Sequence, residues 1–312
     1  MHEEITVPEV TEAVARLSAL LGPREGAVLP LEGGITKRNF RVNFGGTDYV
    51  VRLPGKNTEL LGIDREAERL ATKKAADLRL GPRVAAMLDQ PACLVTCFVE
   101  SREVTAAELR EPRYIDEVGE ALRGFHHSGL ELPTDFYVSE IVSDYAEVSK
   151  SRGGTLPEGF QHARDYARKV VKAVRKNADH QPLPCHNDLL TANFLHDGER
   201  MVIVDWEYAG MGDPFFDLGN FAVNNELGDA DEERLLAAYF GEEANPRQRA
   251  ALKLFRFMSD FREAMWGVVQ TSVSELDFDF DAYADKHFKR MAETTEDERF
   301  RGWLKGAGGR SP

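Results

Sequence analysis

Residues 185–193 read CHNDLLTAN and have the form H-x-D-x-x-x-x-N, with Asp188 and Asn193 at two of the polar positions. Asp205 follows Asn193 by twelve residues, directly behind the apolar run MVIV. The Asp-Gly pair at 197–198 predicts a turn that joins two short strands and returns Asp205 to the first loop. Phosphoryl transfer needs a carboxylate to accept a hydroxyl proton, and an amide oxygen with a second carboxylate to hold Mg²⁺. These residues therefore predict a phosphoryl-transfer site; the plainer alternative is that they form turns and cap a strand.

The chain on either side of this segment divides into two patterns. The runs FRVNF (40–44) and DYVVRL (48–53) flank Gly45-Gly46 and predict a β-hairpin. An apolar run at 92–99 predicts a buried strand, and helices are expected at 5–21 and 63–79. Beyond residue 101 helical patterns dominate, at 105–109, 112–128, 158–178, 231–241, 246–273 and 281–293. We therefore expect an α+β chain with a small sheet-containing lobe over 1–98 and a larger, mainly helical lobe over 99–312, whose tail from about 305 is disordered.

Composition narrows the possible partners. The 312 residues include 39 Lys plus Arg and 53 Asp plus Glu, a formal charge of −14. This acidity disfavours nucleic acid and anionic membranes as partners, because both attract basic surfaces. The first ten residues do not resemble a signal peptide, and no run is long enough to span a bilayer. We expect a cytoplasmic protein; its oligomeric state is left open.

Cysteine and histidine residues have plain interpretations. The three cysteines, Cys93, Cys97 and Cys185, match no zinc pattern. Cys185 is expected to be a small buried residue rather than a nucleophile. His126-His127 lies near the end of a predicted helix, where capping or solvent exposure is expected. Without a third ligand at metal spacing, no zinc site is predicted.

The motifs together resemble a known family. HNDLLTAN followed by VDWEYAGMGDPFFDLGN (204–220) is similar to the choline/ethanolamine kinases, especially their bacterial choline-kinase-like branch. That family sits within the aminoglycoside-phosphotransferase superfamily, so the resemblance implies a bilobal protein-kinase-like fold. It runs from about residue 30 to 270. The other matching segments are GGITKRNFRV (33–42), VVRLPG (50–55), IDREAE (63–68) and SDFREAMWGVVQ (259–270).

The resemblance implies roles for the residues of the two central loops. Asp188 would be the catalytic base, and Asn193 with Asp205 would bind Mg²⁺. Asp217 would brace the catalytic loop, through His186 or through backbone amides.

The resemblance also implies a nucleotide site in the first lobe. Arg52 takes the position of the phosphate-binding lysine and keeps its positive charge on a planar fork. Glu68 would hold Arg52 in place, with Glu66 as the alternative. The remaining ATP-binding residues would be a glycine turn over the phosphates, Gly33, Gly34, Ile35 and Thr36, and a stretch whose backbone reads adenine, Cys97, Phe98 and Val99.

The acceptor pocket is expected in the second lobe. A quaternary ammonium group is attracted to aromatic faces and nearby carboxylates. Tyr208 and Trp266 match the regions that line the family's choline pocket, with Arg262 or Glu263 shaping its wall. An acid found in eukaryotic members falls at Asn224 here, and Glu226 is expected to substitute for it.

The resulting hypothesis is an ATP-dependent kinase that uses Mg²⁺ and acts on a small cationic alcohol, most simply choline. The alternatives are a kinase for ethanolamine, an aminoglycoside or an amino sugar, or a non-catalytic nucleotide-binding protein of the same fold. A protein kinase is disfavoured because no D-F-G is present and no A-P-E segment follows Asp205.

Overall fold

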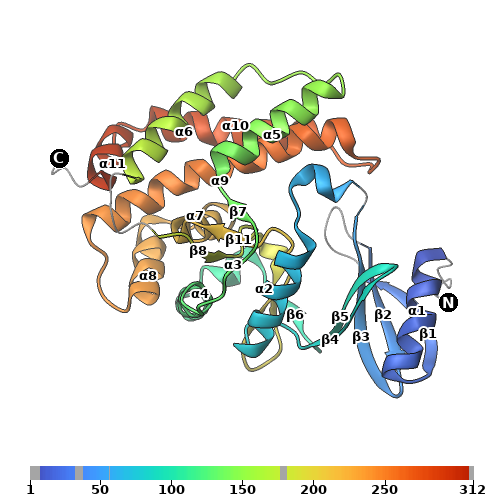
Figure 1. Ribbon diagram of the computed structural model, residues 1–312. Helices are drawn as coiled ribbons and strands as arrows, with labels where there is room; N and C mark the ends of the chain where they lie inside the picture. The colour runs from blue at the N-terminus through green and yellow to red at the C-terminus, as the bar shows by residue number, and fades with distance from the viewer. Residues whose placement is uncertain (1–7, 32–37, 56, 176–180, 309–312) are drawn as a thin grey trace.

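The N-terminal part of the chain is built on a five-stranded antiparallel sheet (Figure 1). The structure is a computed structural model, and it describes residues 8–31, 38–55, 57–175 and 181–308. The strand order is β1-β2-β3-β5-β4, and every neighbouring pair is antiparallel. The strands are β1 (Arg24–Leu31), β2 (Arg38–Phe44), β3 (Thr47–Leu53), β4 (Val84–Asp89) and β5 (Ala92–Cys97). Helix α1 (Pro8–Leu21) packs its apolar face on this sheet and closes a small core of its own.

The predicted hairpin is confirmed, and two further strands were not predicted. Gly45 and Gly46 have φ of +56° and +78°, which suits the two-residue turn between Phe44 and Thr47. The sequence of β1 contains a Gly and a Pro, and that of β4 is rich in Ala, so neither shows the β-branched alternation on which strand prediction depends. Both strands form because the central strands offer them hydrogen-bonding edges.

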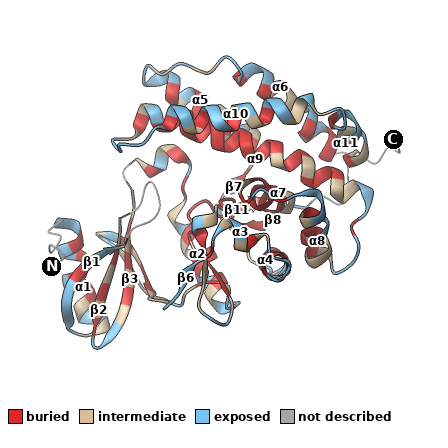
Figure 2. Ribbon diagram, turned by 180° about the vertical axis from the view of Figure 1, so that it is seen from behind, coloured by how far each residue is buried: buried red, intermediate tan, exposed pale blue. Residues whose placement is uncertain are grey.

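Most of the remaining chain is helical, as expected. Helix α9 (Pro246–Val273) runs through the helical part and is buried along most of its length (Figure 2). The other helices are α2 (Arg65–Asp77), α3 (Ala106–Leu109), α4 (Pro112–His126), α5 (Val138–Ser151), α6 (Phe160–Val174), α7 (Pro214–Asn224), α8 (Asp229–Phe240), α10 (Phe280–Glu296) and α11 (Phe300–Ala307). No helix within the described ranges combines the length and apolar character needed to cross a membrane.

Three departures from prediction lie in this helical part. Helices α5 and α7 were not predicted. In α7 the sequence carries Gly219, a weak helix former, yet the helix needs it, since a Cβ there would lie 2.6 Å from the backbone of Phe255 in α9. The tail predicted to be disordered from about 305 instead continues α11 to Ala307, which is buried against the helical core. Residues 309–312 lie outside the described part.

Two small sheets position the central loops. Strands β6 (Arg102–Glu103), β9 (Phe194–His196) and β10 (Met201–Ile203) form one of them, and the predicted hairpin over 193–208 is confirmed by the β9–β10 pair. Strands β7 (Asp135–Phe136), β8 (Leu183–Cys185) and β11 (Gly210–Gly212) form the other. Strand β8 leads directly into the loop that carries Asp188, and β10 leads into Asp205.

Helix α2 is packed into the core of the helical part, although it precedes β4 and β5 in sequence. Ala67, Ala71 and Ala75 are fully buried within the hydrophobic cluster that also contains Trp206. The views in Figures 1 and 2 place α2 between the sheet and the helices. The 3₁₀ turn before it, Thr58–Leu61, also docks there, since the Tyr145 hydroxyl donates to the Leu61 carbonyl at 3.0 Å. The lobe boundary at residue 98 stays a prediction.

Candidate active site

The loop after β8 is held by the buried side chain of Asp217 in helix α7. Its Oδ2 accepts the His186 backbone N–H and its Oδ1 accepts the Asn187 backbone N–H, both at 2.7 Å. The ring Nε2 of His126 donates to the same carboxylate at 2.9 Å. Burial opposes ionisation of Asp217, but the hydrogen bond and charge of His126, with the neighbouring imidazole and backbone N–H of His186, bring its pKa below the ordinary value. An ionised carboxylate therefore fixes the backbone of this loop.

His126 has a different environment from the one predicted. It is 1% exposed, and its Nδ1 lies 2.8 Å from the hydroxyl of Tyr239 in α8. His127, the next residue, is exposed and ends helix α4, so the expectation of capping or exposure holds for His127 and is wrong for His126. The periodicity of α4 turns only one of two adjacent histidines outward.

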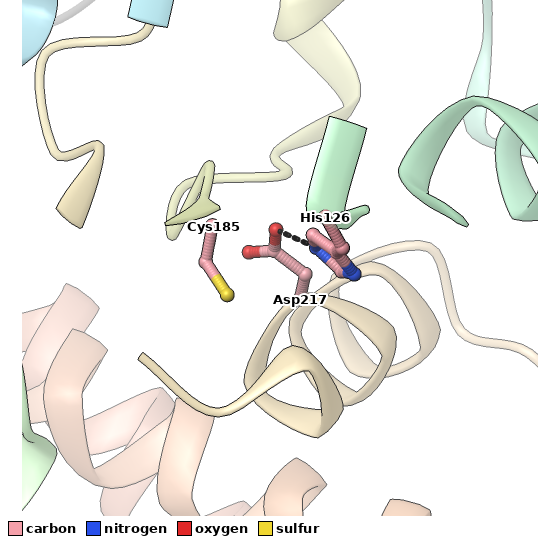
Figure 3. Close-up of side chains that lie close together, drawn as sticks. All are labelled: His126, Cys185 and Asp217. Carbon is pink, nitrogen blue, oxygen red and sulfur yellow. Dashed lines mark hydrogen bonds and ion pairs between the residues drawn. The ribbon is translucent and has the colours of Figure 1, made fainter. Parts of the chain in front are cut away.

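The fold brings a third potential metal ligand to His126 and Asp217, which sequence reasoning did not find. Cys185 lies beside them, and one ligand atom from each residue falls within 4.8 Å of the others (Figure 3). Both oxygens of Asp217 already accept N–H groups, and the Cys185 thiol donates to the Leu183 carbonyl at 3.4 Å. Burial raises the pKa of Cys185, which keeps it protonated. His126 and Asp217 therefore form a structural hydrogen-bonded pair, and Cys185 beside them is the buried cysteine that was expected.

The structure brings Asp188, Asn193 and Asp205 together. The side-chain amide of Asn193 donates to the Asp188 carbonyl at 2.7 Å, which closes the loop on itself. The backbone N–H of Val204 donates to the Asn193 carbonyl at 3.0 Å, and the His186 ring bonds the Val204 carbonyl. These bonds fix the residue before Asp205 against the loop that carries Asp188, as the hairpin prediction required.

The donor atoms at this point suit a hard divalent cation. Because the Asn193 amide nitrogen is used within the loop, its oxygen is left as a ligand, and the Asp205 carboxylate lines the same cleft. Carboxylate and amide oxygens are the ligands that Mg²⁺ takes in nucleotide sites. Asp205 also has φ of +75°, a conformation that costs a non-glycine residue energy and is often found where function requires it. The residues present therefore fit the expected cation.

Arg52, on strand β3, forms ion pairs with three carboxylates. Its Nη2 lies 2.6 Å from Asp205 Oδ1, 3.0 Å from Glu207 Oε2 and 3.3 Å from Glu68 Oε1. Burial would lower the pKa of Arg52, but Glu68 and Glu207 raise it above its ordinary value. Glu66, the alternative partner, pairs instead with Arg69 at the surface. The structure therefore brings Glu68, and not Glu66, to Arg52.

Glu207 belongs to this group, and sequence reasoning missed it. Its carboxylate is 5% exposed and takes part in the ion pair with Arg52. The signal was present in VDWEY, because Asp205 and Glu207 bracket the buried Trp206. A second acid two residues beyond an expected metal ligand would have been the reason to include it.

A cleft of about 330 Å³ separates the sheet from the helical part beside these residues. Its wall includes Val50 and Thr96 from the sheet, Arg52, and Asn193 with Asp205 from the opposite side. The predicted adenine-reading stretch, 97–99, also lines it. Clefts of this kind, lined by apolar side chains with a few charged groups, are where proteins bind small molecules.

Backbone hydrogen bonds distinguish the three residues of the stretch 97–99. The N–H of Cys97 donates to the Arg83 carbonyl at 2.8 Å, and that of Phe98 donates to the Asp48 carbonyl at 3.0 Å. Among the described residues no acceptor is recorded for the Val99 N–H. The backbone N–H of Val99 therefore differs from those of Cys97 and Phe98, and that Val99 reads adenine stays a prediction. The predicted glycine turn, Gly33, Gly34, Ile35 and Thr36, lies outside the described residues.

Three of the expected acceptor residues, Tyr208, Arg262 and Trp266, lie together, and Arg262 also contacts Asp188. The Trp266 ring N–H donates to the Tyr208 hydroxyl at 2.9 Å. The Arg262 guanidinium carbon lies 4.1 Å above the Tyr208 ring, and its Nη1 lies 2.8 Å from Glu263 and 3.4 Å from Asp188. Three predicted substrate-binding residues thus meet, but the protein's own cation covers the Tyr208 face.

Glu226 is not part of this cluster. Its side chain is 74% exposed and lies 3.8 Å from Arg110. It follows the end of α7 in a left-handed conformation, with φ of +56°, which directs the chain into the next turn. The end of the helix therefore prevents a residue two positions beyond Asn224 from taking over its place.

Several known proteins are similar to this chain in sequence and in fold. A model of the "Phosphotransferase enzyme family" matches residues 27–254. The solved structure of a choline/ethanolamine kinase family protein from Mesorhizobium loti is 32% identical with a TM-score of 0.82, covering 96% of this chain and 99% of that one. Protein LicA of Haemophilus influenzae is 25% identical over 276 residues, which are 84% of this chain and 79% of LicA. Human ethanolamine kinase 2 is 27% identical over 267 residues, 77% of this chain and 68% of that protein.

Proposed function

Because this chain belongs to the phosphotransferase enzyme family, and within it to the choline/ethanolamine kinases, we propose that it transfers the γ-phosphate of ATP to the hydroxyl of a small amino alcohol. The observation that carries the proposal is that Asn193, Asp205 and Arg52 line one cleft, while the Asn193 side chain is hydrogen-bonded to the Asp188 carbonyl. A carboxylate, an amide oxygen, a second carboxylate and a cation are the groups that phosphoryl transfer uses.

Asp188 acts as the base in this proposal. The acceptor hydroxyl donates a hydrogen bond to its carboxylate, and the hydroxyl oxygen forms a bond to the γ-phosphorus. The bond from that phosphorus to the β–γ bridging oxygen breaks, ADP leaves with the electron pair, and the hydroxyl proton passes to Asp188. Because the loop is fixed through Asp217, Asp188 is already oriented before substrate binds, and positioning of this kind supplies much of the rate gain.

The remaining groups manage charge on the nucleotide. Asn193 and Asp205 would hold Mg²⁺, which when bound neutralises charge on the phosphate oxygens. Arg52 contributes a buried positive charge at the same end of the cleft, held by Glu68 from helix α2. Val99 would donate its backbone N–H to the base.

Choline is the first acceptor to test, and one observation favours ethanolamine as a second. The carboxylates of Asp188 and Glu263 attract any cationic head group. A trimethylammonium group prefers an open aromatic face, and Trp266 retains its ring while Arg262 covers Tyr208. A primary ammonium group needs hydrogen-bond acceptors instead. The Asp188 carboxylate is one, whereas both oxygens of Glu263 already accept, from Arg262 and from Tyr283.

A coupled ADP-release assay tests the proposal with choline, ethanolamine and an aminoglycoside. We expect turnover with an amino alcohol that depends on ATP and Mg²⁺. Asp188→Asn should reduce kcat by about 1,000-fold or more, because the base contributes about 10²–10⁴. The Asn variant keeps the shape of the loop, so unchanged circular dichroism serves as the control. Turnover in Asp188→Asn equal to that of the wild type would exclude Asp188 as the base.

A further inference from the structure

Arg262 is a buried cation with only part of its hydrogen-bonding capacity used. It lies in the middle of α9 and is 1% exposed. Its Nη1 contacts Glu263 and Asp188. The other carboxylate oxygen of Glu263 accepts a hydrogen bond from the Tyr283 hydroxyl at 2.6 Å. The positive charge is therefore held beside the catalytic carboxylate by groups that are themselves fixed.

The other two nitrogens of the Arg262 guanidinium form no hydrogen bond to the described residues. Within the described part of the chain, neither Nε nor Nη2 finds a hydrogen-bond acceptor, although both are buried. These two nitrogens share one edge of the planar group and present two parallel N–H donors. That edge matches two oxygens of a carboxylate or a phosphate.

Leaving such donors unsatisfied is costly. A buried N–H donor without an acceptor has lost its hydrogen bonds to water and gained none in exchange, and this loss is larger for a charged group. Arg262 nevertheless lies next to Asp188 and Tyr208, inside the cluster expected to hold the acceptor. Two buried N–H donors without acceptors in that place indicate a ligand with two oxygens.

We propose that the Nε–Nη2 edge of Arg262 is an oxyanion site that binds the phosphoryl group as it passes to the acceptor. This inference rests on the proposed function. The contact with Asp188 places the guanidinium beside the base that activates the attacking hydroxyl. The loop 186–193 itself contains no Lys or Arg, so this cation comes from α9.

The positive charge of Arg262 is offset by fewer negative charges late in the reaction than at its start. Before transfer, Asp188 and Glu263 both offset it. Once the hydroxyl proton has passed to Asp188, the first of these negative charges is neutralised. The positive charge of Arg262 is then less compensated when phosphate appears on the product, which favours the transition state over the ground state.

Two variants and a matched control test the oxyanion site by binding. Arg262→Lys keeps the charge and removes the fork, whereas Arg262→Gln removes both. Arg256→Gln is the control, because Arg256 lies on the same helix and pairs with Glu232 in the helical part. Isothermal titration calorimetry would follow ethanolamine, phosphoethanolamine and inorganic phosphate, and circular dichroism would confirm that each variant is folded.

We expect both Arg262 variants to bind phosphoethanolamine and phosphate at least tenfold more weakly than the wild type does, with a smaller change for ethanolamine, which carries no oxyanion. Arg256→Gln should bind all three like the wild type. In turnover, Arg262→Lys should lower kcat about 100-fold, as loss of one oxyanion donor does, with the KM for ATP unchanged. A folded Arg262→Lys with wild-type phosphate affinity and kcat would overturn the inference.

The oxyanion could instead come from a carboxylate on the acceptor, and L-serine tests that source. If Arg262→Lys raises the KM for L-serine and leaves kcat with ethanolamine intact, the site binds an acceptor carboxylate and the phosphoryl assignment is wrong. If the wild type phosphorylates no amino alcohol, the proposed function fails, while the phosphate titrations still decide whether Arg262 binds an oxyanion. If Arg262→Gln does not fold, Arg262→Lys carries both comparisons.

Discussion

Replacing Asp217 by Asn should destabilise the protein by about 3 kcal/mol. The carboxylate accepts three N–H groups, from His186, Asn187 and His126, at 2.7–2.9 Å. An Asn oxygen can replace one carboxylate oxygen, but its NH₂ group must then face an N–H donor, so one bond is lost. A hydrogen bond to a charged group contributes about 1.5–3 kcal/mol and a neutral one about 0.5–1.5. One lost bond and two weakened ones together give about 3 kcal/mol.

Urea unfolding followed by tryptophan fluorescence measures this loss. Asp231→Asn is the matched control, because Asp231 is half-buried at the start of α8 and accepts one backbone N–H, from Gly228. The Asn side chain keeps an oxygen for that bond, so the change should stay within about 0.5 kcal/mol. A comparable small effect in Asp217→Asn would refute the reasoning. Under conditions in which Asp217→Asn is fully folded, its kcat should also be more than tenfold below that of the wild type. The reason is that the loop carrying Asp188 loses the carboxylate that fixes its backbone.

The effect should depend on pH. The pKa of Asp217 is below its ordinary value of 3.8, so its ionised form stabilises the folded state above that pH. The stabilisation is lost as the pH falls through the folded-state pKa. The gap in unfolding free energy between wild type and Asp217→Asn should therefore be full at pH 7 and should narrow below about pH 4. A gap that stays constant down to pH 2 would contradict the ionised state of Asp217.

Three further predictions concern Glu68, Glu226 and Cys185. Glu68→Ala should weaken ATP binding more than tenfold in a titration, because Arg52 loses a holding partner, whereas Glu66→Ala should not; equal effects would contradict the assignment. Glu226→Ala should leave kcat and KM within twofold of wild type for every acceptor, and a raised KM would return Glu226 to the pocket. Burial keeps the pKa of Cys185 raised, so at pH 8 its thiol should react with a disulfide reagent only after unfolding; fast labelling of the native protein, located by mass spectrometry, would be inconsistent with that burial.

The central loops could be predicted because their geometry is local. The spacing of Asp188 and Asn193 and the hairpin that returns to Asp205 depend on short-range turns, which leave a pattern in the sequence. The hairpin and long helix α9 likewise carry their own periodicity. For the same reason Arg52 could be placed on a strand, and register favoured Glu68 over Glu66.

Other features depend on contacts between distant segments and left no such pattern. His126 lies 91 residues from Asp217 in the chain, and only the packing of α4 on α7 and α8 brings the two together. Whether Arg262 lies over Tyr208 or beside it depends on helix rotation, which residue types do not reveal. Helix α7 was hidden by Gly219, because the benefit of close packing on α9 does not appear in a propensity scale.

The attachment of α2 to the helical core has a mechanical consequence. Arg52 travels with the five-stranded sheet, while Glu68 is tied through Ala67, Ala71 and Ala75 to the larger body. If the sheet rotated relative to the helical part to admit or release nucleotide, Arg52 would move with the sheet and Glu68 would stay with the helices. The Arg52–Glu68 ion pair would then break on opening and re-form on closing.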